Sequence, residues 1–232
     1  MQKFGVALEE TVRYIYLALK ALRFWHRPPP IKTPDELVEY VDTRSKFVAQ
    51  TTLYGYVKTR AGTRYVSLFE DEVFVQSLNI AKWEIYLACL ADLAVFCAAS
   101  VSGQTPASDD EIRSLAIYLV DCATRNEEIP AERPQGFEDI RSAFRTRVQQ
   151  TPWKSMVAGE SAFQGSLDAL VEWAPIADVL KIDDAEVVKN SMRFKWKKVR
   201  DQFNSLIDAE SVLDAWRIQE ERGNRLEAAH AS

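Results

Sequence analysis

The strongest constraint on the fold is an apolar run at residues 85–101, in which only Asp92 and Ser100 are not apolar. A helix needs roughly 17 to 25 apolar residues to cross a bilayer, so this run sits at the lower limit and carries a carboxylate near its middle. The residues before it, 70–84, lack the one-sided basic pattern that sets membrane topology. We therefore expect a helix buried in the core of the fold, with a transmembrane helix as the alternative.

Helix start signals recur along the chain, and glycine is scarce. Glycine accounts for 8 of 232 residues, about half its usual share of roughly 7%. Capping boxes, in which Ser or Thr is followed three residues later by Glu, begin at Thr33, Ser67 and Ser108. The first box predicts a helix from Pro34 that ends at Gly62.

The pattern as a whole predicts an all-α fold of seven or eight helices in an irregular bundle. Besides the helix from Pro34, start signals and periodicity predict helices at residues 4–27, 67–102, 108–123, 137–150, 161–173, 183–206 and 211–222. The alternative for 67–102 is two helices divided at Ser77 and Asn79. Residues 51–65 are rich in Thr, Tyr and Val, so a β-hairpin is the alternative there, although we favour helix.

The domain organisation has two interpretations. The bundle either divides into an N-terminal lobe, 1–102, and a C-terminal lobe, 108–222, or forms one continuous domain. In both cases we expect a frayed tail at 223–232.

The composition limits the classes of partner. The chain carries 29 Lys and Arg against 34 Asp and Glu, a net charge of −5. An acidic balance argues against a dedicated nucleic-acid-binding protein.

Cys89, Cys97 and Cys122 form no CxxC pair, so neither a disulfide framework nor a zinc site is expected. We expect a cytoplasmic protein.

The helix expected at 4–27 carries its cations on one side. They are Arg13, Lys20, Arg23 and Arg27. Cations on one side and apolar residues on the other are typical of a helix that lies in the interface of an anionic membrane. The plainer interpretation, which we prefer, is a core helix with a solvated charged stripe.

A second basic stretch spans residues 189–200. It contains six cations and no acid, namely Lys189, Arg193, Lys195, Lys197, Lys198 and Arg200. Such a stretch could attract anionic lipid, phosphate or RNA. Trp196 lies within this stretch but belongs to the apolar seam of its own helix, the line of apolar residues that packs against the core. We therefore prefer a solvated basic face over a dedicated anion site.

Few reactive constellations are present. The two histidines, His26 and His230, are too few for the usual imidazole-based mechanisms and metal sites. No Ser-x-x-Lys or GxSxG motif occurs, and Ser161, in the nearest imitation, is expected to cap a helix instead. We therefore expect no catalytic residue, no metal and no cofactor, while enzymatic activity as such stays open.

Asp92 is the most unusual single residue, because its neighbours on the same helix face are all apolar. A buried carboxylate without a partner is costly and tends to stay protonated. We expect a partner on another helix, an Arg or a Tyr hydroxyl, and the alternative is a functional proton site.

These observations favour a non-enzymatic helical adaptor or assembly factor that binds another protein. Contact with an anionic membrane through residues 4–27 is an additional option. The alternative is a small-molecule-binding helical protein or a hydrolase with a site between helices near Asp92.

Overall fold

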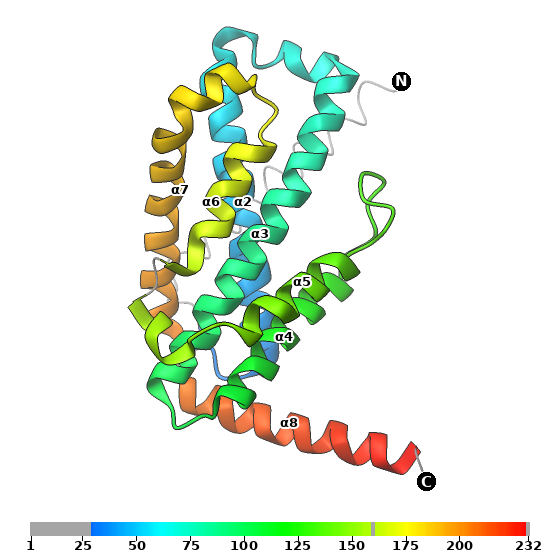
Figure 1. Ribbon diagram of the computed structural model, residues 1–232, viewed down its shortest axis with the longest axis vertical. Helices are drawn as coiled ribbons and strands as arrows, with labels where there is room; N and C mark the ends of the chain where they lie inside the picture. The colour runs from blue at the N-terminus through cyan, green and yellow to red at the C-terminus, as the bar shows by residue number, and fades with distance from the viewer. Residues whose placement is uncertain (1–28, 159–160, 231–232) are drawn as a thin grey trace. The chain divides into compact units, whose positions relative to one another are not determined.

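The computed structural model describes residues 29–158 and 161–230 of the chain, and over these residues the protein is all-α, as predicted (Figure 1). The helices are α2 (Pro34–Ala61), α3 (Glu72–Gln104), α4 (Asp109–Arg125), α5 (Glu138–Gln149), α6 (Gln164–Trp173), α7 (Asp178–Leu206) and α8 (Ala209–His230). Residues 31–232 form one compact unit, and the link at 105–108 lies inside it. The helix predicted at 4–27 lies outside the described residues.

Helix α2 begins and ends where the sequence predicts. The Thr33 hydroxyl accepts a hydrogen bond from the Glu36 amide at 3.2 Å, and the Glu36 carboxylate accepts one from the Thr33 amide at 3.0 Å. The helix ends at Gly62, whose φ of 55° favours glycine. Because α2 runs through residues 51–61, the helix interpretation of this segment is confirmed and no hairpin forms there.

The start of α3 differs from the prediction of a capping box at Ser67. The Ser67 hydroxyl donates backward to the Arg64 carbonyl at 2.9 Å, and residues Ser67–Glu70 form a short 3-10 turn, η3. Asp71 caps α3 instead, since its carboxylate accepts from the amides of Val73 and Phe74 at 2.9 and 3.2 Å. From there α3 continues without a break.

Helix α3 is the core of the bundle. It packs against α2, α4 and α6. Within the described residues it is the one helix long and apolar enough to span a membrane. Of its most apolar stretch, 89% is buried inside the protein. The prediction of a buried core helix at 85–101 is therefore confirmed.

Helix α4 begins with the capping box predicted at Ser108. The Ser108 hydroxyl accepts from the Glu111 amide at 3.3 Å, while Glu111 accepts from the Ser108 amide at 2.8 Å. The Arg217 guanidinium of α8 donates to the same carboxylate at 2.6 Å. Hydrogen bonds from Arg217 and Ser108 lower the pKa of Glu111 to about 2.

The low pKa of Glu111 predicts a loss of stability in acid. An ordinary glutamate has a pKa of 4.5, so the contribution of Glu111 is fully present above that pH and is lost as the pH falls toward about 2. Glu111→Gln should flatten this part of the pH–stability curve by about 1 kcal/mol, after allowance for solvent screening. Urea unfolding across this range measures the effect, with the exposed loop residue Glu128 changed to Gln as the control. Equal curves for wild type and Glu111→Gln would contradict it.

The C-terminal half departs from the predicted boundaries. Helix α7 begins at Asp178, ahead of the expected residue 183, and α8 continues to His230, past the expected end at 222. Ser161 lies in a 3-10 turn, η5 (Ser161–Phe163), and is not the N-cap of α6, which begins after Phe163. Figure 1 shows α8 extending away from the other helices toward its C-terminal end.

Candidate functional site

Asp92 lies at the meeting point of three helices. Its carboxylate on α3 is fully buried and accepts from the Arg147 guanidinium of α5 at 2.7 Å. The backbone amide of Ser166, in the first turn of α6, donates to the other carboxylate oxygen at 2.6 Å. Arg147 also donates to the Ala162 carbonyl at 2.9 Å. The arginine partner expected for Asp92 is therefore Arg147.

A second layer surrounds this contact. The Trp196 indole of α7 donates to the Ser166 hydroxyl at 3.1 Å, and that hydroxyl donates to the Phe163 carbonyl at 3.0 Å. Trp196 is 1% exposed and belongs to the apolar seam of α7, as predicted. A Cβ added to Gly165 would lie 3.0 Å from a carboxylate oxygen of Asp92, so glycine permits this close approach.

The electrostatics of Asp92 match a buried, fully engaged carboxylate. Burial raises the pKa of Asp92, although the Arg147 guanidinium and the Ser166 amide act in the opposite direction. Burial, with the charge of Asp92 added, also raises the pKa of the Cys89 thiol. Both carboxylate oxygens are occupied by donors from within the fold, so the arrangement fixes α5 and α6 to α3.

Among the described residues, α7 borders a surface groove on either side, and Asp92 lines neither of these two grooves. One, of about 290 Å³, lies between α6 and α7 and is lined by Arg193, Trp196 and Arg200, with residues of η5 and α6 opposite. The other, of about 470 Å³, lies between α2 and α7, with Gly55 and Lys195 among its lining residues.

The cations of the basic stretch lie on different sides of α7. Some contact other parts of the bundle, and others point away from it. Lys189 donates to Asp168 at 2.7 Å, and the Arg200 guanidinium lies 5.9 Å from the centre of the Phe163 ring. The outer face of α7 carries Arg193, Phe194, Lys197 and Lys198, all exposed, where Arg193 pairs with Glu186 at 3.5 Å and the Lys198 ammonium lies 4.7 Å from the centre of the Phe194 ring. We call these four residues the α7 basic face. Lys195 lies at the side of the helix, in the α2–α7 groove.

Sequence reasoning missed a surface at one end of the bundle. Besides Leu180, which is 40% exposed, six large apolar side chains there are 39–78% exposed, namely Val66, Phe69, Val73, Trp173, Val179 and Ile182. Val66 and Phe69 lie in the α2–α3 connection and Val73 in the first turn of α3, while Trp173 ends α6 and Val179 and Ile182 lie in the first turns of α7. The α2–α3 and α6–α7 connections lie at the same end of the bundle (Figure 1). The ion pair of Arg60 with Asp184 joins these two regions. We call the six residues the apolar end surface.

The other predicted site residues are placed as follows. Arg13, Lys20, Arg23 and Arg27 lie outside the described residues, so the membrane interpretation stays a prediction. Within the part of the chain that the structure describes, no group of three or more His, Cys, Asp or Glu side chains could hold a metal ion. Cys89 and Cys97 are buried.

No protein-family model, curated protein or solved structure matches this chain. Three candidate sites lie within the described residues: the buried Asp92 contact, the α7 basic face and the apolar end surface.

Proposed function

We propose that this protein is a non-enzymatic helical adaptor that binds another protein through the apolar end surface. The observation that carries the proposal is the exposure of six large apolar side chains at one end of the bundle, among them Val73 at 73% and Ile182 at 78%. Single exposed apolar residues are ordinary, but gathered ones mark interaction sites in soluble proteins. The Trp and Phe in this group are residue types that contribute strongly to protein interfaces.

The charge around the surface indicates the kind of partner. Residues 64–73 and 172–184 contain seven acids and two cations. One of these acids, Asp184, is neutralised by Arg60 of α2. The expected partner is therefore a protein whose apolar contact residues are surrounded by Lys and Arg, because complementary charge favours the correct encounter.

Site-specific photo-crosslinking tests this proposal. A benzoylphenylalanine placed at Val73 or at Ile182 should capture the same protein in cells that produce the chain, since the two positions flank one surface. The same group at Ile218 of α8, which is 52% exposed, should not capture it.

Two results decide the outcome. Capture of one common protein from positions 73 and 182, with its crosslinked segment rich in Lys or Arg, supports the proposal. Absence of any adduct from both positions, or equal capture of the same proteins from position 218, rejects the apolar end surface as the binding site.

A further inference from the structure

The outer face of α7 carries an apolar stripe that no other element covers within the described residues. Leu180, Val187 and Phe194 are spaced seven residues apart and are 40%, 71% and 60% exposed. Residues seven apart on a helix are offset by only about 20°, so the three side chains follow one line. The buried seam, which includes Met192 and Trp196, lies on the opposite side of the helix.

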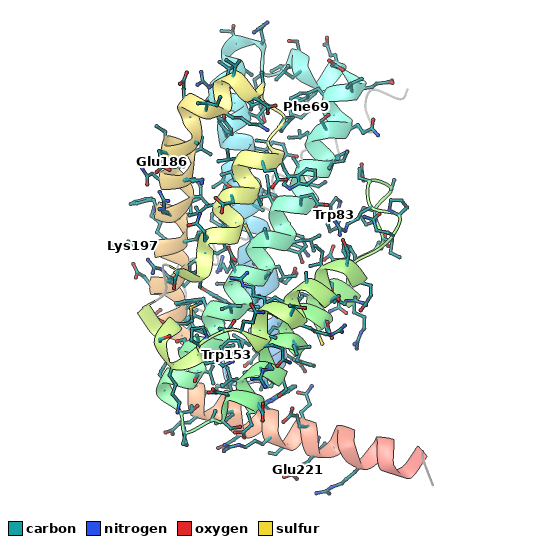
Figure 2. The ribbon with its side chains drawn as sticks, viewed as in Figure 1. Phe69, Trp83, Trp153, Glu186, Lys197 and Glu221 are labelled. Carbon is teal, nitrogen blue, oxygen red and sulfur yellow. The ribbon has the colours of Figure 1, made fainter. Side chains whose placement is uncertain are left out.

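The charges beside this stripe are separated along the helix. Asp183 and Glu186 lie beside its first half, whereas Lys197 and Lys198 lie beside its second half. Figure 2 shows the side chains of Glu186 and Lys197 on the same outer side of α7, away from the rest of the bundle. Within the described residues no ion pair of Asp183, Lys197 or Lys198 is formed. The first half of the face thus carries acids and the second half mostly bases, with Asp201 as the one exposed acid there, and Glu186 pairs with Arg193 across the boundary at 3.5 Å.

We propose that a second copy of this chain docks on this face, with the two α7 helices antiparallel about a two-fold axis near Asn190. Two helices that pack along their length use apolar residues at two positions of every seven, and this stripe supplies one of the two, with charged and polar residues at the other. In this arrangement Val187 of one copy packs against Phe194 of its partner, and Asp183 of one copy faces Lys197 and Lys198 of the other. Because the two copies are related by a two-fold axis, each of these contacts occurs twice in the dimer.

The charge pattern selects this occupant and this orientation. A face that is acidic at one end and basic at the other is complementary to itself only when the second copy is reversed, because a parallel pair would place acid on acid and base on base. Val187 also lines the groove between α2 and α7, so there is open space on one side of its side chain. Gly55 on the α2 side of that groove has nothing within 4 Å of an added Cβ.

The mass of the full-length protein in solution tests the pairing. Sedimentation equilibrium from about 1 μM to 1 mM, a range that covers weak dimers, should show a species of twice the chain mass. Phe194→Glu should reduce the fraction of dimer at least tenfold, because it places a charge in the apolar stripe. Ile218→Glu changes a residue of similar exposure on α8 and should leave the dimer intact. A monomer at all concentrations, or a Phe194→Glu variant that dimerises as well as wild type, overturns the proposal.

A charge exchange tests the antiparallel register. Asp183→Lys alone and Lys197→Glu alone should each be monomeric, since each homodimer would set like charges opposite one another twice. A mixture of the two variants should form a heterodimer, in which lysine faces glutamate at one site and the original pair remains at the other. A mixture that stays monomeric, or single variants that still dimerise, rejects the register. Circular dichroism of each variant verifies that it is folded.

This inference does not require the adaptor function, although the two surfaces meet at the start of α7, where Leu180 and Asp183 lie beside Val179 and Ile182. Val187, Phe194 and Lys197, farther along the helix, belong to the pairing face alone. A protein that stays monomeric but is crosslinked to one partner at positions 73 and 182 would retain the adaptor function alone, and a dimer without such a partner would retain the pairing alone.

Discussion

Asp92→Ala is expected to lower the free energy of unfolding by about 3 kcal/mol. The substitution removes the acceptor for the Ser166 amide and the partner of Arg147 in a fully buried position. Arg147 has a side chain 34% exposed and regains part of its hydration, which keeps the loss below that of a fully buried pair. Chemical denaturation followed by far-UV circular dichroism measures the change.

A double-mutant cycle with Gly165 gives the control. Gly→Ala within a helix ordinarily stabilises by up to about 1 kcal/mol. Here the added Cβ would lie 3.0 Å from a carboxylate oxygen that two hydrogen bonds hold in place, so Gly165→Ala should destabilise wild type. In the Asp92→Ala background the same change should be neutral or stabilising. Additive effects of the two substitutions would contradict the close approach.

This experiment also separates the two interpretations of Asp92. A large loss of stability identifies a structural contact that joins α3, α5 and α6. A variant with unchanged stability would instead favour a carboxylate retained for proton transfer or ligand binding. The engagement of both carboxylate oxygens, and the absence of Asp92 from the lining of both grooves, favour the structural interpretation.

Local signals predicted much of the fold. The apolar run at 85–101 became the core helix α3, and the capping boxes at Thr33 and Ser108 became helix starts. Each of these signals lies in one continuous segment of the sequence, so it can be recognised without knowledge of distant contacts. The box at Ser67 failed because two local alternatives competed, a backward hydrogen bond to Arg64 and a better cap from Asp71.

The candidate sites depended on distant contacts, which explains why sequence reasoning recovered them only in part. The burial of Asp92 followed from its apolar neighbours, but its partner Arg147 is 55 residues away and no local pattern selects it. The apolar end surface was missed for a related reason. Val73 and Ile182 look like ordinary apolar helix positions, and only the packed bundle leaves both of them exposed.

Arg133 was also missed, because an arginine in the polar, proline-containing segment between α4 and α5 resembles a solvated loop residue. In the structure it is 3% exposed and donates to Glu84 of α3 and to Asp139 of α5. It also donates to the carbonyl of Gly136 at 3.0 Å. One side chain therefore fixes this segment to two helices.

Arg133→Ala is expected to lower the free energy of unfolding by about 2 to 3 kcal/mol and to loosen the segment at 126–137. The acids left without their partner are partly exposed and recover some hydration, which limits the loss. Cleavage by a glutamate-specific protease measures the loosening directly, since three glutamates lie within the segment. Arg125→Ala removes an exposed arginine at the end of α4, directly before the segment, and should leave both stability and cleavage unchanged. Arg133→Lys should fall between them, because a single ammonium group does not reproduce the fork of a guanidinium that reaches two carboxylates and a carbonyl. Slow cleavage of Arg133→Ala, equal to that of Arg125→Ala, would mean that the segment is held by its apolar contacts instead.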